Sequence, residues 1–190
     1  MHITAITMMV LMTIGAHGKS GDHPGEPNLT VCMELVPSLR VTIGQAQEFA
    51  STMFAPVGVI IKWRRGFRDC PAQAIQVTIS DRTPENLMPG ALAYARPYKG
   101  AHTRLFYDRI AAVGDAGLWP SLLAHVLVHE ITHILQKSSR HSAHGIMKAR
   151  WDPEDYVQMK SKPLPFVDED ITLIRAGLAA RASRAMIATR

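Results

Sequence analysis

The residues best suited to chemistry lie in one stretch, "HEITHILQKSSRHSAHGIM", from His129 to Met147. It opens with His-Glu-x-x-His, so His129 and His133 are four positions apart. On an α-helix, positions i and i+4 lie on the same face, and the two imidazoles would point at one ion. Glu130 lies about 100° further round the helix, from where its carboxylate can reach a water held by that ion. The pattern is typical of a zinc site with a general base.

A zinc ion held by two histidines needs a third protein ligand. Three downstream residues could supply it, namely His141, His144 and Glu154. If the helix that carries the motif continued, His141 would lie about 12 Å beyond His133 along the axis and could not reach the ion. The sequence therefore predicts that the helix ends near Gln136–Ser139 and that the serine-rich residues there turn the chain back.

The motif lies in a strongly apolar stretch, "WPSLLAHVLVHEITHILQ", which we predict to be a helix with Pro120 in its first turn. Polar side chains that project from such a helix into a protein interior need partners, which a metal ion and water would supply. His125 extends the row of histidines by one turn. We interpret it as a hydrogen-bonded helix histidine rather than as a fourth ligand.

Four segments resemble the metzincin metallopeptidases, and among them the matrixins most. "LLAHVLVHEITHIL" is similar to their zinc-binding helix, and "HSAHGIM" is similar to their third histidine followed by the methionine turn. "ALAYARPYKGAHTRLFYD" resembles the edge-strand region that precedes the zinc helix, and "FVDEDITLIRAGL" resembles the closing helix. The segments cover residues 91–178, and the chain looks like a divergent bacterial relative of the family.

The resemblance implies a role for each residue of the motif. It implies that His129, His133 and His141 bind one Zn²⁺ ion, and that Met147 lies in the turn beneath the metal. It also implies that Glu130 takes a proton from a zinc-bound water, which hydrolyses a peptide bond, and later passes the proton to the leaving amine. The implied activity is that of a zinc metalloendopeptidase.

The resemblance further implies an edge strand beside the cleft, to which an extended peptide could add through main-chain hydrogen bonds. The residues of this substrate-binding strand would be Leu92, Ala93, Tyr94 and Ala95. The chain departs from the family pattern after the motif. Gln136 stands where metzincins carry a glycine, and His141 comes two residues later than the third histidine of the family.

The rest of the chain predicts one α/β domain with a mixed sheet, which the resemblance identifies as zincin-like. Strands are predicted at Leu29–Val36, Gly58–Arg65, Ala74–Asp81, Ala91–Tyr98 and Thr103–Ile110, the last two as a hairpin or as two edge strands. Helices are predicted after a capping box formed by Thr42 and Gln45, at the motif, after a cap at Asp152, and from Asp168 onward.

The first residues favour export. Residues 3–16 are uncharged, and residues 16–18 form a small-x-small triplet where a signal peptidase could cut, so residues 1–18 are interpreted as a signal peptide. Residues 19–28 are then a linker, 29–182 the metzincin-like catalytic domain and 183–190 a C-terminal tail. Export to the periplasm or the medium predicts a disulfide between Cys32 and Cys70, because such compartments are oxidising. After signal removal we expect a monomer without stable membrane association.

The charge pattern argues against nucleic acid as a partner. The 190 residues carry a net charge of +5, without a basic run that includes aromatic residues. The favoured function is an exported zinc endopeptidase that acts on peptides or proteins. Two alternatives stay open, a non-catalytic zinc-stabilised binding domain and a zinc hydrolase of a non-peptide substrate. Glu130 argues against the first, because a structural zinc site is closed by four protein ligands and needs no acid.

Overall fold

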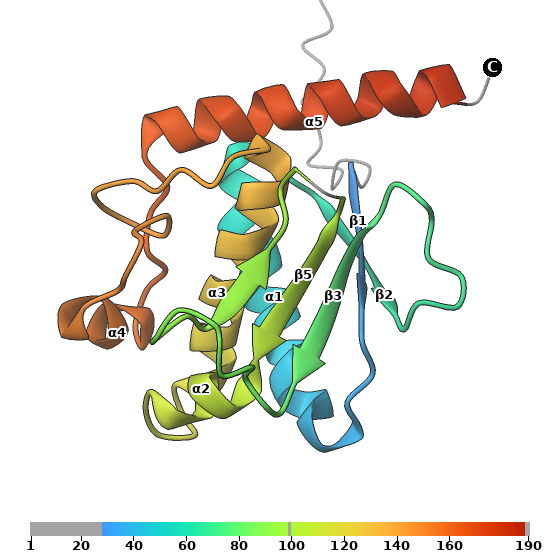
Figure 1. Ribbon diagram of the computed structural model, residues 1–190. Helices are drawn as coiled ribbons and strands as arrows, with labels where there is room; N and C mark the ends of the chain where they lie inside the picture. Colours follow the sequence, from blue (N-terminus) through green and yellow to red (C-terminus); the bar gives the residue numbers. More distant parts are fainter. Residues whose placement is uncertain (1–27, 99, 189–190) are drawn as a thin grey trace, which may run out of the picture.

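A five-stranded mixed sheet forms the centre of the fold (Figure 1). The computed structural model describes residues 28–98 and 100–188. The strands lie in the order β2-β1-β3-β5-β4, and β4 runs antiparallel to β5 while the other pairs are parallel. Their bounds are Leu29–Met33 for β1, Ile61–Arg65 for β2, Ile75–Ser80 for β3, Ala93–Ala95 for β4 and His102–Phe106 for β5. The predicted fold class, α/β with a mixed sheet, is confirmed.

Two helices, α1 (Arg40–Phe54) and α3 (Trp119–Gln136), pack together on one face of this sheet (Figure 1). Both bury apolar side chains in one core with the sheet, which is the main stabilising contribution expected for such a layer. Within the described residues, no helix lies over the opposite face of the sheet (Figure 1). The remaining helices are α2 (Tyr107–Ala112), α4 (Pro153–Met159) and α5 (Asp168–Ala188), and short 3₁₀ turns span Pro37–Leu39 and Ala55–Val57.

Two local predictions are wrong. Thr42 and Gln45 lie inside α1 and form no capping box, because a 3₁₀ turn leads directly into the helix at Arg40. Residues 107–110 were expected to continue a strand but belong to α2. Asp108 lies in the first turn of that helix, where a carboxylate is favourable, and it accepts hydrogen bonds from the N–H (3.0 Å) and hydroxyl (2.8 Å) of Thr83.

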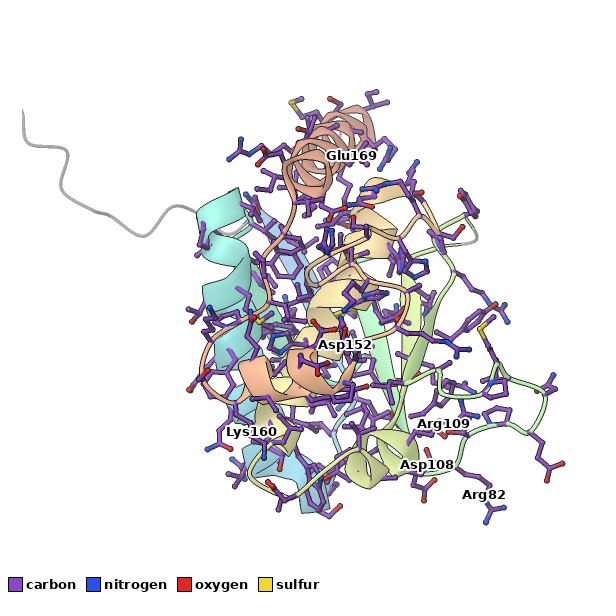
Figure 2. The ribbon with its side chains drawn as sticks, turned by 90° about the vertical axis from the view of Figure 1, so that its left-hand side faces the viewer. Arg82, Asp108, Arg109, Asp152, Lys160 and Glu169 are labelled. Carbon is purple, nitrogen blue, oxygen red and sulfur yellow. A yellow bond between two sulfur atoms is a disulfide. The ribbon has the colours of Figure 1, made fainter. Side chains whose placement is uncertain are left out.

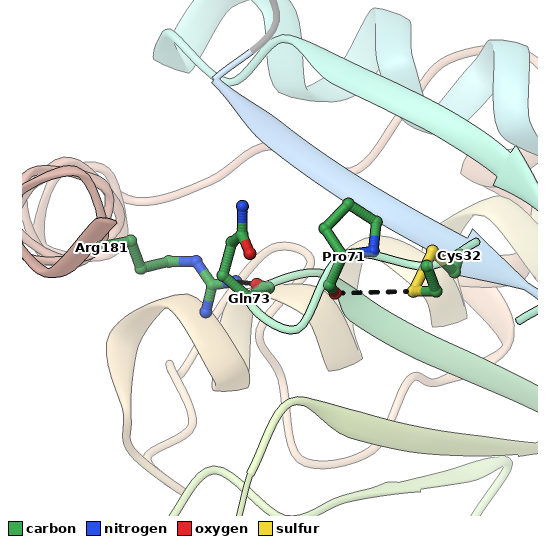
Figure 3. Close-up of a disulfide and its surroundings, with 5 residues drawn as sticks. Cys32, Pro71, Gln73 and Arg181 are labelled. Atoms are coloured by element: carbon green, nitrogen blue, oxygen red, sulfur yellow. Dashed lines mark hydrogen bonds between the residues drawn. A yellow bond between two sulfur atoms is a disulfide. The ribbon is translucent and has the colours of Figure 1, made fainter. Parts of the chain in front are cut away.

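Helix α5 lies across one end of the sheet and of α3 (Figure 1). It begins at Asp168, as predicted, and continues through residues 183–188, which the sequence analysis assigned to a tail. Two arginines attach it to distant loops. Arg175 Nε donates to the carbonyl of Val57 (3.4 Å), and the guanidinium of Arg181 donates to the carbonyl of Gln73 (Figure 3).

The contact between α5 and α3 depends on Gly177. A Cβ atom at Gly177 would lie 1.9 Å from the carbonyl oxygen of Leu135 in α3, so the backbones approach too closely for any side chain. We expect Gly177→Ala to lower the free energy of unfolding by about 2 kcal/mol or more in a urea titration. Gly44→Ala is the matched control, because its Cβ in α1 would meet nothing within 4 Å. It should raise stability by up to about 1 kcal/mol, and equal effects of the two changes would contradict the prediction.

The predicted disulfide joins Cys32 of β1 to Cys70, which lies in the loop between β2 and β3 (Figure 3). Their Cα atoms are 6.0 Å apart, within the usual range for this bond. The bond joins the loop to the interior strand β1, in which Cys32 is fully buried. The predicted signal peptide, and the predicted linker up to residue 27, lie outside the described residues. Of the described helices, none combines the length and the apolar character needed to cross a membrane.

Candidate metal centre

Helix α3 ends in an unusual way that shapes the site. Lys137 takes a left-handed conformation, with φ 48° and ψ 43°, which glycine usually provides at the end of a helix. Its N–H donates to the carbonyl of Ile134 (3.4 Å), and the N–H of Ser138 donates to the carbonyl of His133 (3.2 Å). The helix therefore ends at Gln136, within the predicted range, and the chain turns back there.

The returning loop brings His141 beside the two histidines of α3. One ring nitrogen from each of His129, His133 and His141 lies within 4.8 Å of the other two. The ring centroids are 4.7 Å apart for His129 and His133, 5.3 Å for His129 and His141, and 4.9 Å for His133 and His141. The rival candidates His144 and Glu154 are exposed and are not part of this group.

The hydrogen bonds of the helix histidines determine which nitrogens are free. Nδ1 of His129 lies 2.9 Å from the carbonyl of Ile146, and Nδ1 of His133 lies 2.8 Å from the carbonyl of Ser138. A carbonyl only accepts, so both Nδ1 atoms carry the proton and both Nε2 atoms present lone pairs. These two Nε2 atoms are 3.0 Å apart. Two acceptors at this distance repel each other unless a cation lies between them, so the residues fit a metal ion.

The pKa values keep the three imidazoles in their neutral, metal-binding form. Burial, followed by the neighbouring His133, lowers the pKa of His129 to about 3. Burial also lowers the pKa of His133 to about 4. The pKa of His141 is lowered by partial burial and then by the positive charge of Arg140. Protons would therefore not compete for the free nitrogens at neutral pH.

Glu130 lies between the histidines and the free edge of β4. Its side chain is 8% exposed, and burial raises the pKa of its carboxyl to about 8, although a hydrogen bond from the Ala95 N–H lowers it. A cation held by the histidines would lower that pKa further, because an opposite charge favours the carboxylate. With a cation bound there, Glu130 would be a carboxylate that can accept a proton beside the histidine group.

A buried carboxylate holds the loop that carries His141. Asp170, in the first turn of α5, is 1% exposed and accepts hydrogen bonds from Arg140 Nη2 (2.5 Å) and Ser142 Oγ (2.9 and 3.0 Å), the two neighbours of His141. Gln136 Nε2 also donates to it (3.3 Å). Arg140 additionally pairs with Glu169 (3.3 Å), which Figure 2 shows at the start of α5. These bonds, which we call the Asp170 clamp, fix the residues on both sides of His141, the candidate third ligand.

The segment after His141 orients His129 through a hydrogen bond to the carbonyl of Ile146. Gly145 has φ 74°, and a Cβ there would lie 2.1 Å from the carbonyl of Pro165, so this turn requires glycine. The next carbonyl, that of Ile146, accepts both from His129 and from Trp151 Nε1 (3.2 Å). Met147 follows and is fully buried. Its position directly beneath a metal ion stays a prediction.

His125 is a hydrogen-bonded histidine of the helix, as predicted from its sequence position. The side chain is 1% exposed, its Nδ1 donates to the carbonyl of Ser121 (2.7 Å), and its Nε2 accepts from the N–H of Leu164 (3.1 Å). Both ring nitrogens therefore have partners that suit the neutral imidazole. Burial lowers the pKa of His125 to about 4.

This neutral histidine predicts a loss of stability in acid. The pKa of His125 is lower in the folded chain than the value of 6.5 in the unfolded chain, so unfolding takes up a proton between these values. Its contribution is complete above about pH 6.5 and falls toward pH 4, by about 1 kcal/mol between pH 7.5 and 5.5. Urea unfolding at both pH values should show that His125→Asn, although less stable, loses less on acidification. Equal losses in the two proteins would contradict the assignment.

Strand β4 forms the free edge of the sheet beside this group. The N–H of Phe106 donates to the carbonyl of Leu92 (2.9 Å), and the N–H of Arg96 donates to that of His102 (3.4 Å). Since main-chain groups alternate in direction along a strand, those of Ala93 and Ala95 point away from β5, toward the free edge. The predicted residues 92–95 thus lie at an edge, at the level of Glu130.

The comparisons with known proteins concern the fold. No family model matches the sequence, and no curated protein matches it. Among solved structures, archaemetzincin from Methanopyrus kandleri is similar, with a TM-score of 0.54 and 14% sequence identity over 83% of this chain and 99% of that one. The chain has an archaemetzincin-like fold. The predicted zincin-like architecture is therefore confirmed, whereas a particular likeness to matrixins is not tested by this structure.

Several residues of the site were not found from the sequence. Arg140 and Ser142 flank His141 but belong to no recognised motif. Asp170 lies about thirty positions further along the chain, and it reaches them only because of the way α5 packs. Trp151 was also missed, although it contacts the rings of both His125 (6.2 Å between centroids) and His129 (5.7 Å). A tryptophan closely following a histidine cluster was the one available signal.

Proposed function

We propose that the protein is a zinc-dependent metallopeptidase that cleaves within peptide or protein chains. The observation that supports this most is the convergence of three neutral histidine nitrogens next to a buried glutamate at a free strand edge. We assign His129, His133 and His141 as ligands of one zinc ion and Glu130 as general base. The archaemetzincin-like fold agrees with this assignment.

Each group in the site has a separate role in the proposed peptide hydrolysis. Zinc, when bound, supplies a Lewis acid that polarises a peptide carbonyl and makes water more acidic. The free edge of β4 holds an extended peptide through the outward N–H and carbonyl of Ala93 and the outward carbonyl of Ala95, whose N–H donates to Glu130. Glu130 takes a proton from the attacking water and gives it to the leaving amine, for which its raised pKa is suitable. Asp170 keeps His141 in place through Arg140 and Ser142.

The number of ligands bears on whether the site is catalytic or structural, and the disulfide bears on whether the protein is exported. A zinc site that only stabilises a fold is closed by four protein ligands, whereas the group within the described residues has three, which would leave room for water or substrate on a bound zinc ion. The disulfide between Cys32 and Cys70 agrees with export into an oxidising compartment, and we include export in the proposal.

The test combines metal analysis with an unbiased cleavage assay. Protein reconstituted with one equivalent of zinc should retain it through gel filtration and cleave members of a peptide library detected by mass spectrometry. Protein stripped with a chelator should cleave none until zinc is returned. Stoichiometric zinc binding without any cleavage of peptides or unfolded proteins would favour the non-catalytic binding domain instead.

A further inference from the structure

We propose that the cleft beside the histidine group selects peptides with an acidic side chain close to the scissile bond, and that Arg96 binds this carboxylate. The inference rests on the proposed peptidase function and names its substrate class.

The pocket has a volume of about 390 Å³ and lies between the end of β4 and the loop that carries His141. It is lined by residues 94–98 and by Ser139. On one side, the N–H of Ala95 donates to Glu130. On the other side, Ser139 follows Ser138, whose carbonyl accepts from His133. The pocket is therefore next to both the proposed base and a proposed ligand.

The lining of the pocket is positive and aromatic. Among the described residues that line it, Arg96 is the charged one, and none is acidic. The guanidinium of Arg96 lies 5.5 Å from the centroid of the Tyr94 ring, a cation–π contact that orients it. Tyr94 and Tyr98 line the pocket and are 44% and 73% exposed, so both side chains are accessible to a ligand.

Arg96 has no carboxylate partner of its own in the described part of the chain. The ion pairs found there use Arg140, Lys148 and Lys160 instead. A second cation lies close by, because Arg104 of β5 is directly opposite Tyr94 in the antiparallel pair. An unpaired, oriented guanidinium favours a carboxylate, which it can bind through two parallel hydrogen bonds, and Arg104 adds positive charge opposite Tyr94, two positions along the strand.

The direction of the edge strand indicates which part of a substrate would meet the pocket. Ala95 lies level with Glu130, and the chain continues from there to Arg96 and Tyr98. Antiparallel pairing is the better hydrogen-bonded arrangement for an added strand. A peptide that pairs with β4 in this way places the residues before its scissile bond beside Arg96. The acidic side chain is therefore expected on the N-terminal side of the cut.

The first test compares peptides that differ by one charge. In otherwise identical peptides with glutamate or glutamine before the scissile bond, the zinc-loaded protein should show a kcat/KM about tenfold higher for glutamate, the scale of one partly enclosed charge-assisted contact. Arg96→Ala should remove this preference, Arg96→Lys should retain part of it, and Arg96→Glu should shift it toward lysine. Arg82→Ala removes the same charge at the far end of the molecule from Glu169 (Figure 2) and should change nothing.

The second test measures binding without turnover. The zinc-loaded Glu130→Gln variant should bind the glutamate peptide about tenfold more tightly than the glutamine peptide, and adding Arg96→Ala should abolish the difference. Cleavage by the wild type with no preference, or with one that survives Arg96→Ala, would overturn the inference and leave the peptidase function intact. Binding preference without cleavage of any peptide would support the role of Arg96 in binding an acidic side chain and would contradict the peptidase function. Neither cleavage nor preference would contradict both.

Discussion

Replacing Glu130 by glutamine is expected to reduce peptide hydrolysis by at least about 10²-fold, the scale of a lost general base. Glutamine has nearly the same shape, and its amide oxygen can still accept the hydrogen bond from the Ala95 N–H. It cannot take up a proton from water or pass one to the leaving amine. The measurement is kcat/KM on a peptide identified in the library, with zinc content determined on the same sample.

The fold and the metal content should be unchanged in this variant. Glu130 is not one of the three clustered ligands, and a neutral amide is easier to bury than the carboxylate whose pKa burial raises to about 8. Glu154→Gln is the matched control, because that glutamate is exposed in the first turn of α4. It should retain full activity. Activity of Glu130→Gln close to that of wild type, in a preparation free of other proteases, would refute the assignment.

Removing the imidazole of His141 is expected to weaken zinc binding by more than about 100-fold, since mutation of groups that only support ligands already costs 10–100-fold. The zinc content of His141→Ala after dialysis should fall well below one ion per chain. His129 and His133 would remain, but two histidines hold zinc poorly. Competition with a chelator measures the affinity, and Trp151, which lies against His129, offers a fluorescence signal for binding.

Two control variants separate His141 from the other candidates. His144→Ala and Glu154→Ala should bind one zinc ion with unchanged affinity, because both side chains are exposed and are outside the histidine group. The opposite pattern, with zinc retained in His141→Ala and lost in Glu154→Ala, would mean that a glutamate completes the site. The proposed resemblance of the site to metzincins would then be wrong, although the fold would stand.

Much of the site follows from local sequence because its central element is a helix. The bounds of α3 agree with the apolar stretch predicted to be a helix with Pro120 in its first turn, and the i, i+4 spacing alone places His129 and His133 on one face. Asp152 was predicted as the cap of a short helix and forms a complete capping box with Asp155 at α4 (Figure 2). Such features depend on hydrogen bonds between residues a few positions apart, which a single sequence specifies.

The surroundings of that helix depend on tertiary packing. The sequence left three candidates for the third ligand, and His141 is brought in by a left-handed turn at Lys137 and by the Asp170 clamp. In that turn Lys137, which is not a glycine, adopts φ 48°. This conformation costs energy that packing must offset. The edge position of β4, with the Ala95 backbone beside Glu130, follows from the order of the strands. Contacts of this kind join residues tens of positions apart, so they depend on the folded chain and not on any local pattern.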